Sequence, residues 1–225
     1  MPRHILVLGA TGPSGIAFCR YALEEGHTLT VYVRTPTKIP SDIESHSSVS
    51  VIVGPLDDAE ALRKAAGCGA KTVVSFLGPL VTIPPKFSGT PITDGYKLLY
   101  PMLVDAGFTR GLFLSTPSAD DPSDKRGFYW RTAIFGIRTL GGSAYAEITG
   151  LHSFISSQPT AQLKWTLFRV PFLGSGEPKE VHAGYLGDAE EGGRLERKGM
   201  ARWVLVEMEK EEWVGKAPVL TNKKL

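Results

Sequence analysis

Three glycines near the start of the chain, Gly9, Gly12 and Gly15, are spaced by two residues each time in ILVLGATGPSGIAF. They stand between an apolar run that predicts a strand and a stretch that predicts a helix. In that context Gly9 forms the tight turn, Gly12 lets a phosphate approach the backbone, and Gly15 allows close helix packing. The amides of residues 12–15 and the positive helix end then bind a dinucleotide pyrophosphate, with an empty strand-to-helix turn as the alternative.

The end of the second expected strand, VYVRTPTK, indicates which dinucleotide the turn holds. An acidic residue there typically binds the ribose 2′-hydroxyl of NAD, whereas a cation favours a 2′-phosphate. This chain has Arg34, whose guanidinium can bind a phosphate through two hydrogen bonds, and Lys38 four residues later. The pattern favours NADP(H), and the alternative is a pair of solvated surface cations.

Four polar side chains are candidates for catalysis. Ser115 and Thr116 end the fifth expected strand, where a hydroxyl can orient a carbonyl or polarise an enone without ionising. Capping of the strand end is the alternative for both. Tyr145 and His152 are seven residues apart, which places them on one helix face as a possible hydrogen-bond donor and a possible proton donor. The alternatives are a partly buried aromatic residue and a structural histidine.

The elements that must position these side chains follow an alternating pattern. Short apolar runs predict strands, and helices are expected at 13–25, from Asp57 or Asp58 to Gly67, and at 93–107, the last kinked or interrupted at Pro101. The expected strands are 4–9, 28–33, 49–54, 71–78, 111–116 and 164–170. This order predicts an α/β fold, a Rossmann-type doubly wound parallel sheet in a single domain over residues 1–225.

Two irregular stretches follow the carboxyl ends of central strands, which is where ligands bind in such sheets. We therefore expect substrate-side loops around 79–92 and 116–142. The aromatic segment 127–142 is expected to form a pocket wall, and contact with a partner subunit or a membrane surface is the alternative. Residues 171–225 are expected to form a small C-terminal part.

Several segments together resemble a known family: LVLGATGPSG, VYVRTPTK, VIVGPLDD, VVSFLG, LFLST and WTLFRVPFL, followed by the closing helix and strand in 199–222. The chain resembles atypical short-chain dehydrogenases/reductases, in the NAD(P)-binding branch with NmrA-like and biliverdin-IXβ-reductase-like proteins. The resemblance implies a Rossmann domain that binds NADP(H) with substrate over the nicotinamide. It also implies contacts of Thr11 and Ser14 with phosphates, Arg34 with the 2′-phosphate, Leu56 and Asp57 with adenine, and Leu77 and Gly78 with ribose.

One departure from the family pattern concerns catalysis. Typical short-chain dehydrogenases use Tyr-x-x-x-Lys, but Thr149 stands four residues after Tyr145, and no other tyrosine precedes a lysine at that spacing. Without a neighbouring cation a tyrosine pKa stays near ~10, so the phenol is a poor base at neutral pH. Alcohol dehydrogenation through this tyrosine is therefore not expected.

Composition excludes several other classes of protein. The net charge is +2 and the basic cluster 194–199 is interrupted by a glutamate, so a nucleic-acid surface is not supported. Two cysteines and scattered histidines argue against a disulfide framework and a metal site. No signal peptide or spanning segment is recognised, so we expect a cytoplasmic protein with a small-molecule substrate and no membrane partner. A monomer is favoured over a dimer.

The function that fits these features is an NADP(H)-dependent reductase of a small, fairly apolar carbonyl, enone or polycyclic metabolite. Two alternatives remain open. One is a non-catalytic NADP(H)-binding regulator of the NmrA type, and the other is a non-redox isomerase or cyclase that keeps the Rossmann fold.

Overall fold

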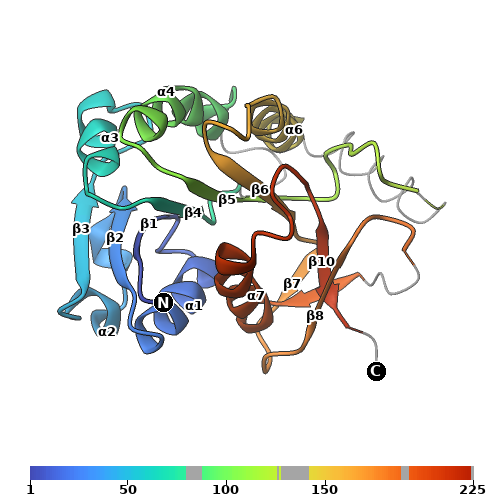
Figure 1. The fold of residues 1–225 in the computed structure, drawn as a ribbon, viewed down its shortest axis with the longest axis horizontal. Helices are drawn as coiled ribbons and strands as arrows, with labels where there is room; N and C mark the ends of the chain where they lie inside the picture. Colours follow the sequence, from blue (N-terminus) through green and yellow to red (C-terminus); the bar gives the residue numbers. More distant parts are fainter. Residues whose placement is uncertain (80–87, 126, 128–141, 189–192, 224–225) are drawn as a thin grey trace.

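A central sheet with helices on both faces forms the molecule (Figure 1). The computed structural model describes residues 1–79, 88–125, 127, 142–188 and 193–223. In spatial order the eight strands are β3 (Val49–Val53), β2 (Thr28–Val33), β1 (His4–Leu8), β4 (Thr72–Ser75), β5 (Arg110–Ser115), β6 (Lys164–Arg169), β10 (Val219–Asn222) and β8 (Val181–Gly184). The order on both sides of β1 confirms the doubly wound arrangement, and all the strands predicted from apolar runs are present.

Parallel pairing aligns the strands that precede the predicted site residues. Leu8 of β1 lies opposite Tyr32 of β2, and Ser75 of β4 lies opposite Phe113 of β5. The carboxyl ends of these strands therefore lie side by side, where the following loops can meet. The strands are buried on both faces, which explains why their sequences are continuous apolar runs.

Two helical layers cover the sheet (Figure 1). One face carries α1 (Pro13–Glu24), α2 (Ser41–Glu44) and α7 (Arg197–Lys210), and the other carries α3 (Ala59–Ala66), α4 (Pro91–Asp105) and α6 (Gly142–Ser156). A short 3₁₀ turn, η1, spans Pro36–Lys38. Phe18 of α1 and Val204 of α7 belong to the core below the sheet, while Tyr96 of α4 and Leu151 of α6 belong to the core above it.

Two helices can be compared with the sequence predictions. Asp58, and not Asp57, caps α3, because its Oδ1 accepts hydrogen bonds from the amides of Glu60 and Ala61, both at 3.0 Å. Gly67 ends that helix as predicted. Of the two alternatives predicted at Pro101, a kink or an interruption, the interruption is wrong, since α4 continues through this residue to Asp105 despite the missing N–H.

The central sheet is mostly parallel, as predicted, with one antiparallel pair at its edge. β8 at the edge runs antiparallel to β10, and β7 (Phe172–Gly174) pairs in parallel with β9 (Arg194–Glu196) outside the main sheet. β7, β8 and β9 have three or four residues each and are partly exposed, so they lack the apolar run that marks the central strands. Residues 171–225 contribute α7, β8 and β10 to the main layers.

Parts of both predicted substrate-side loops lie outside the described residues. These parts are 80–87 of the loop 79–92, and 126 and 128–141 of the loop 116–142, including nearly all of the expected pocket wall 127–142. Within the described ranges, no helix has the length and apolar character to cross a bilayer.

Candidate functional site

The glycine turn between β1 and α1 has the geometry that its sequence predicts. Gly9 has a φ of +78°, and a side chain there would bring its Cβ within 2.9 Å of the backbone of Phe76 at the end of β4. A Cβ on Gly15 would overlap the carbonyl oxygen of Gly9. At Gly12 a Cβ would meet only that oxygen, at 3.5 Å, so the backbone at Gly12 is open to a close ligand.

The amides available to an anion are fewer than the sequence prediction of residues 12–15. Gly12 donates its N–H to the carbonyl oxygen of Gly9 at 3.1 Å, and Pro13 has no N–H. Ile16 already donates to Gly12 at 2.9 Å, as the first bond of α1. The amides of Ser14 and Gly15 therefore remain for a ligand at the positive end of the helix. No acidic side chain stands in the first turn of α1 to compete with an anion.

A cavity of about 420 Å³ lies beside this turn and joins the ends of β4, β5 and β6. Among its lining residues are these predicted site residues: Gly12, Pro13, Ser14, Gly15, Leu77, Gly78, Ser115 and Thr116. The predicted residues outside this lining are Gly9, Thr11, Arg34, Lys38, Leu56, Asp57, Tyr145 and His152. The glycine turn and the residues at the end of β5 thus line one cavity.

The residues predicted for the adenosine end follow neighbouring strands at the same edge. Arg34 follows β2, Leu56 and Asp57 follow β3, and the two strands are paired up to Val33 and Val53. Leu56 is half-buried against Gly95 of α4, whereas Arg34, Lys38 and Asp57 are exposed. Neither cation forms an ion pair with any residue that the structure describes, so both are open to an anionic ligand.

The hydroxyl of Ser115 contacts a histidine from α6. Its Oγ lies 3.2 Å from Nδ1 of His152, and the two residues are only 2% and 7% exposed. Burial lowers the pKa of His152 to about 4, the Arg169 guanidinium acts in the same direction, and nearby aspartates oppose both. The imidazole is therefore neutral at neutral pH, and either group can donate in this hydrogen bond.

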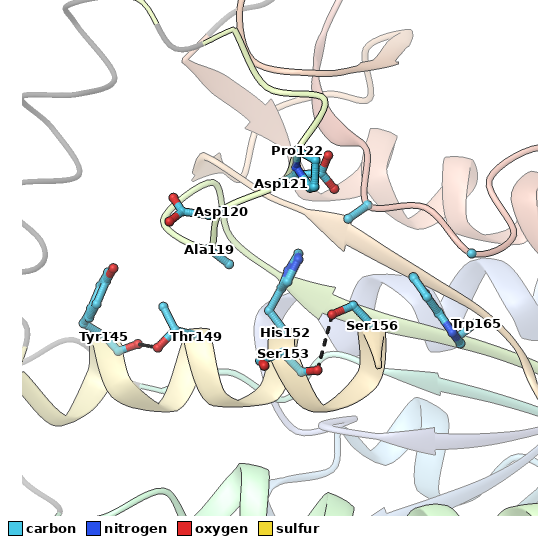
Figure 2. A pocket seen from close by; sticks show the side chains of 12 residues that line it. Ala119, Asp120, Asp121, Pro122, Tyr145, Thr149, His152, Ser153, Ser156 and Trp165 are labelled. Atoms are coloured by element: carbon cyan, nitrogen blue, oxygen red, sulfur yellow. Dashed lines mark hydrogen bonds between the residues drawn. The ribbon is translucent and has the colours of Figure 1, made fainter. Parts of the chain in front are cut away.

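A second cavity, of about 610 Å³, has His152 in its lining (Figure 2). Tyr145, Thr149 and His152 line it from one face of α6, opposite Asp120 and Asp121 on the loop after β5. This arrangement confirms that Tyr145 and His152 share a helix face. Tyr145 is in the lining of this second cavity and is not in the lining of the cavity beside the glycine turn. Thr149 donates its hydroxyl to the carbonyl oxygen of Tyr145 at 2.9 Å and so contacts its own helix.

A buried ion pair holds the loop after β5 in place. Arg169 of β6 donates to both carboxylate oxygens of Asp124, at 2.7 and 2.8 Å, and to the carbonyl oxygen of Ala119 at 3.4 Å. Its Nε donates to Ala217 at 2.7 Å. One guanidinium thus joins the loop that walls the second cavity to the central sheet.

Comparison with known proteins identifies the family. A family model described as NAD(P)H-binding matches residues 9–211. The chain belongs to this NAD(P)H-binding family. A comparison with curated proteins finds no match.

Solved structures of the same fold cover nearly the whole chain. A short-chain dehydrogenase/reductase from Veillonella parvula DSM 2008, in complex with NADP, is 16% identical with a TM-score of 0.78, covering 99% of this chain and 95% of that chain. ChuY, an anaerobillin reductase from Escherichia coli O157:H7, is 17% identical with a TM-score of 0.75, covering 99% and 98%. The oxidoreductase ylbE from Lactococcus lactis is 15% identical with a TM-score of 0.74, covering 98% and 91%. These likenesses and the family match confirm the resemblance stated from the sequence motifs.

Among the lining residues of the cavity of about 420 Å³ that were not predicted as site residues, three carry a charge or an exposed ring. Glu147 of α6 is fully buried and accepts the amides of Ile92 and Thr93 at 2.9 and 2.6 Å, so it caps α4 from a distant helix. Phe172 could have been found, because it follows β6 at the edge where the other loops gather. Arg197 belongs to the basic cluster 194–199, which the sequence analysis considered only as a nucleic-acid surface.

Proposed function

We propose that the protein is an NADP(H)-dependent reductase of a small, fairly apolar carbonyl, enone or polycyclic compound. The observation that carries this proposal is a single cavity that joins the glycine turn to the Ser115 hydroxyl. Support also comes from two structural neighbours, of which one is an anaerobillin reductase and another binds NADP.

The residues around the cavity fit a dinucleotide. The unpaired amides of Ser14 and Gly15 bind the pyrophosphate at the start of α1, and the open backbone at Gly12 admits it. Arg34, exposed at the end of β2, binds the 2′-phosphate and gives the preference for NADP(H). When bound, the nicotinamide supplies the hydride for reduction.

Ser115 orients the substrate oxygen. With the proton of the neutral His152 on Nδ1, the imidazole donates to Ser115 Oγ at 3.2 Å, and the serine proton is free for the substrate. This hydrogen bond strengthens as negative charge develops on the substrate oxygen during reduction. The final proton comes from water, since the low pKa of His152 leaves no imidazolium to supply it at neutral pH.

The cavity wall favours an apolar substrate. Leu114, Ile148, Leu151 and Val170 line it. Phe172 also lines it, yet the residue is 68% exposed, unusual for a large aromatic side chain. An exposed ring at the rim offers a flat surface on which a conjugated or polycyclic compound can stack.

Turnover assays test this function. Incubation with NADPH and a panel of quinones, enones and aldehydes should consume NADPH, and Ser115→Ala should lower kcat about 100-fold with unchanged NADPH affinity. Tyr145→Phe is the matched control, because Tyr145 lines the second cavity and its loss should leave kcat near wild type.

The two competing functions give different results in the same assays. A regulator binds NADPH tightly and consumes none with any compound of the panel. An isomerase or cyclase converts its substrate without a change in NADPH absorbance. Either result would contradict the proposed reductase.

A further inference from the structure

The first residue of α7, Arg197, lines the same cavity as the first turn of α1. The two helices lie beside each other on one face of the sheet (Figure 1). Both helices therefore begin at the wall of the cavity, and their positive ends act on the same space. An anion bound at Ser14 and Gly15 is thus within the field of α7 as well.

The Arg197 guanidinium has a defined position. Its Nη1 donates to the carbonyl oxygen of Gly174 at 3.0 Å, to that of Leu173 at 3.3 Å, and to Ser175 Oγ at 2.8 Å. These acceptors belong to β7 and the residue after it, so the arginine is held against the segment that follows β6. A guanidinium fixed in this way loses little conformational freedom when it binds a ligand.

The charge of Arg197 has no carboxylate partner among the described residues. Its Nε is buried without a hydrogen-bond acceptor. The neighbouring Glu196 is engaged elsewhere, accepting from the amide of Gly176 at 2.6 Å and from Arg194 Nε at 2.9 Å. The carboxylate in the cavity wall, Glu147, is occupied by the start of α4. A half-buried guanidinium without a carboxylate partner lowers the stability of the fold unless an anion binds to it.

The geometry points to Arg197 as a ligand of the dinucleotide pyrophosphate, across the cavity from the glycine turn. This inference rests on the proposed function, because it assumes that the cavity holds NAD(P)H. The pyrophosphate is the anion that the amides of Ser14 and Gly15 select, and among the described lining residues Arg197 is the cation available to neutralise it. The contact adds affinity for both dinucleotides, whereas Arg34 distinguishes between them.

Binding measurements with three probes test the inference. The probes are NADPH, NADH and adenosine 2′-monophosphate, which carries the 2′-phosphate but no pyrophosphate. Arg197→Gln should weaken NADPH and NADH equally, by about 10- to 100-fold, and leave adenosine 2′-monophosphate unchanged. It should also flatten the salt dependence of NADPH binding. Arg34→Ala should show the crossed pattern, weakening NADPH and adenosine 2′-monophosphate but not NADH.

Two further variants control for folding and for charge. Arg202→Gln removes a cation from the same helix whose guanidinium lies over the ring of Tyr21, 4.7 Å from its centroid, and should leave all three affinities unchanged. Arg197→Lys retains the charge and should recover part of the lost affinity. Thermal unfolding identifies a variant that has lost its structure.

Three outcomes would overturn the inference. The first is an unchanged NADPH affinity in a folded Arg197→Gln protein. The second is an equal loss for adenosine 2′-monophosphate, which would show general distortion of the site. The third is a rise in substrate KM alone, which would assign Arg197 to an anionic substrate. If the wild-type protein binds neither dinucleotide, the proposed function fails and the inference fails with it.

Discussion

The buried imidazole of His152 makes stability depend on pH in a way that can be calculated. Burial lowers its pKa from 6.5 to about 4, and the guanidinium of Arg169 acts in the same direction. The carboxylates of Asp120, Asp121 and Asp124 favour the imidazolium but do not outweigh burial. In the unfolded chain the imidazole is hydrated and titrates in its ordinary range.

The sign and size of the effect follow from the two pKa values. Above pH 6.5 the imidazole is neutral in both states and causes no pH dependence. As the pH falls from 6.5 to about 4, the unfolded chain takes up a proton that the folded protein does not. The free energy of unfolding therefore decreases, by about 3 kcal/mol at the lower limit. Below that pH both states are protonated, and this histidine causes no further loss.

Urea unfolding of the wild type and of His152→Gln, from about pH 7 to about pH 4, measures this effect. The wild type should lose about 3 kcal/mol more than the variant over that range. Ser115→Ala is the control and should follow the wild-type curve, since burial, and not the Ser115 hydrogen bond, is the main cause of the low pKa. Parallel curves for the wild type and His152→Gln would refute the reasoning, because the imidazole would then titrate alike in both states.

Three other substitutions test separate parts of the site. Asp124→Asn leaves the buried Arg169 guanidinium without its partner charge and should lower the free energy of unfolding by about 3–5 kcal/mol. Asp42→Asn, at the exposed pair with Arg20, is the control and should lower it by less than about 1 kcal/mol. Urea unfolding measures both losses, and equal losses would contradict the burial assigned to the Arg169–Asp124 pair. Arg34→Ala should raise the Kd for NADPH about tenfold and leave that for NADH unchanged, and a fluorescence titration showing equal losses would exclude the 2′-phosphate contact. Phe172→Ala should raise substrate KM about 2- to 10-fold without affecting the Kd for NADPH, and steady-state kinetics with an unchanged KM would remove Phe172 from the substrate site.

The sequence predicts the central strands well because both of their faces are buried. β1 is apolar after its first residue, β2 is rich in β-branched and aromatic residues, and β5 contains the apolar run 112–114, so each stands out without knowledge of its neighbours. β8 at the edge is different, since half-buried side chains such as His182 break the apolar run and its pairing with β10 depends on residues far along the chain. Edge strands of this kind are stabilised by tertiary pairing rather than by their own pattern.

Parts of the site that depend on the local conformation of consecutive residues were also predictable. The glycine turn needs only the local conformation of β1 and α1, and Gly9 has the positive φ that the motif requires. Even there, the prediction that all amides of residues 12–15 bind phosphate was too broad, because Gly12 donates within the turn. Proline at the next position removes a further donor from the set.

Contacts between elements could not be derived from spacing. Ser115 and His152 were each singled out, but their contact spans 37 residues and depends on how α6 is rotated against the sheet. Buried residues such as Ile148, Leu151 and Ile155 give α6 a broad apolar surface that does not select one rotation. The rotation adopted places Leu151 in the wall of the cavity beside the glycine turn, and His152 with Tyr145 in the wall of the second cavity. Position 149, where the typical family pattern has lysine, lies in the lining of the second cavity beside Tyr145.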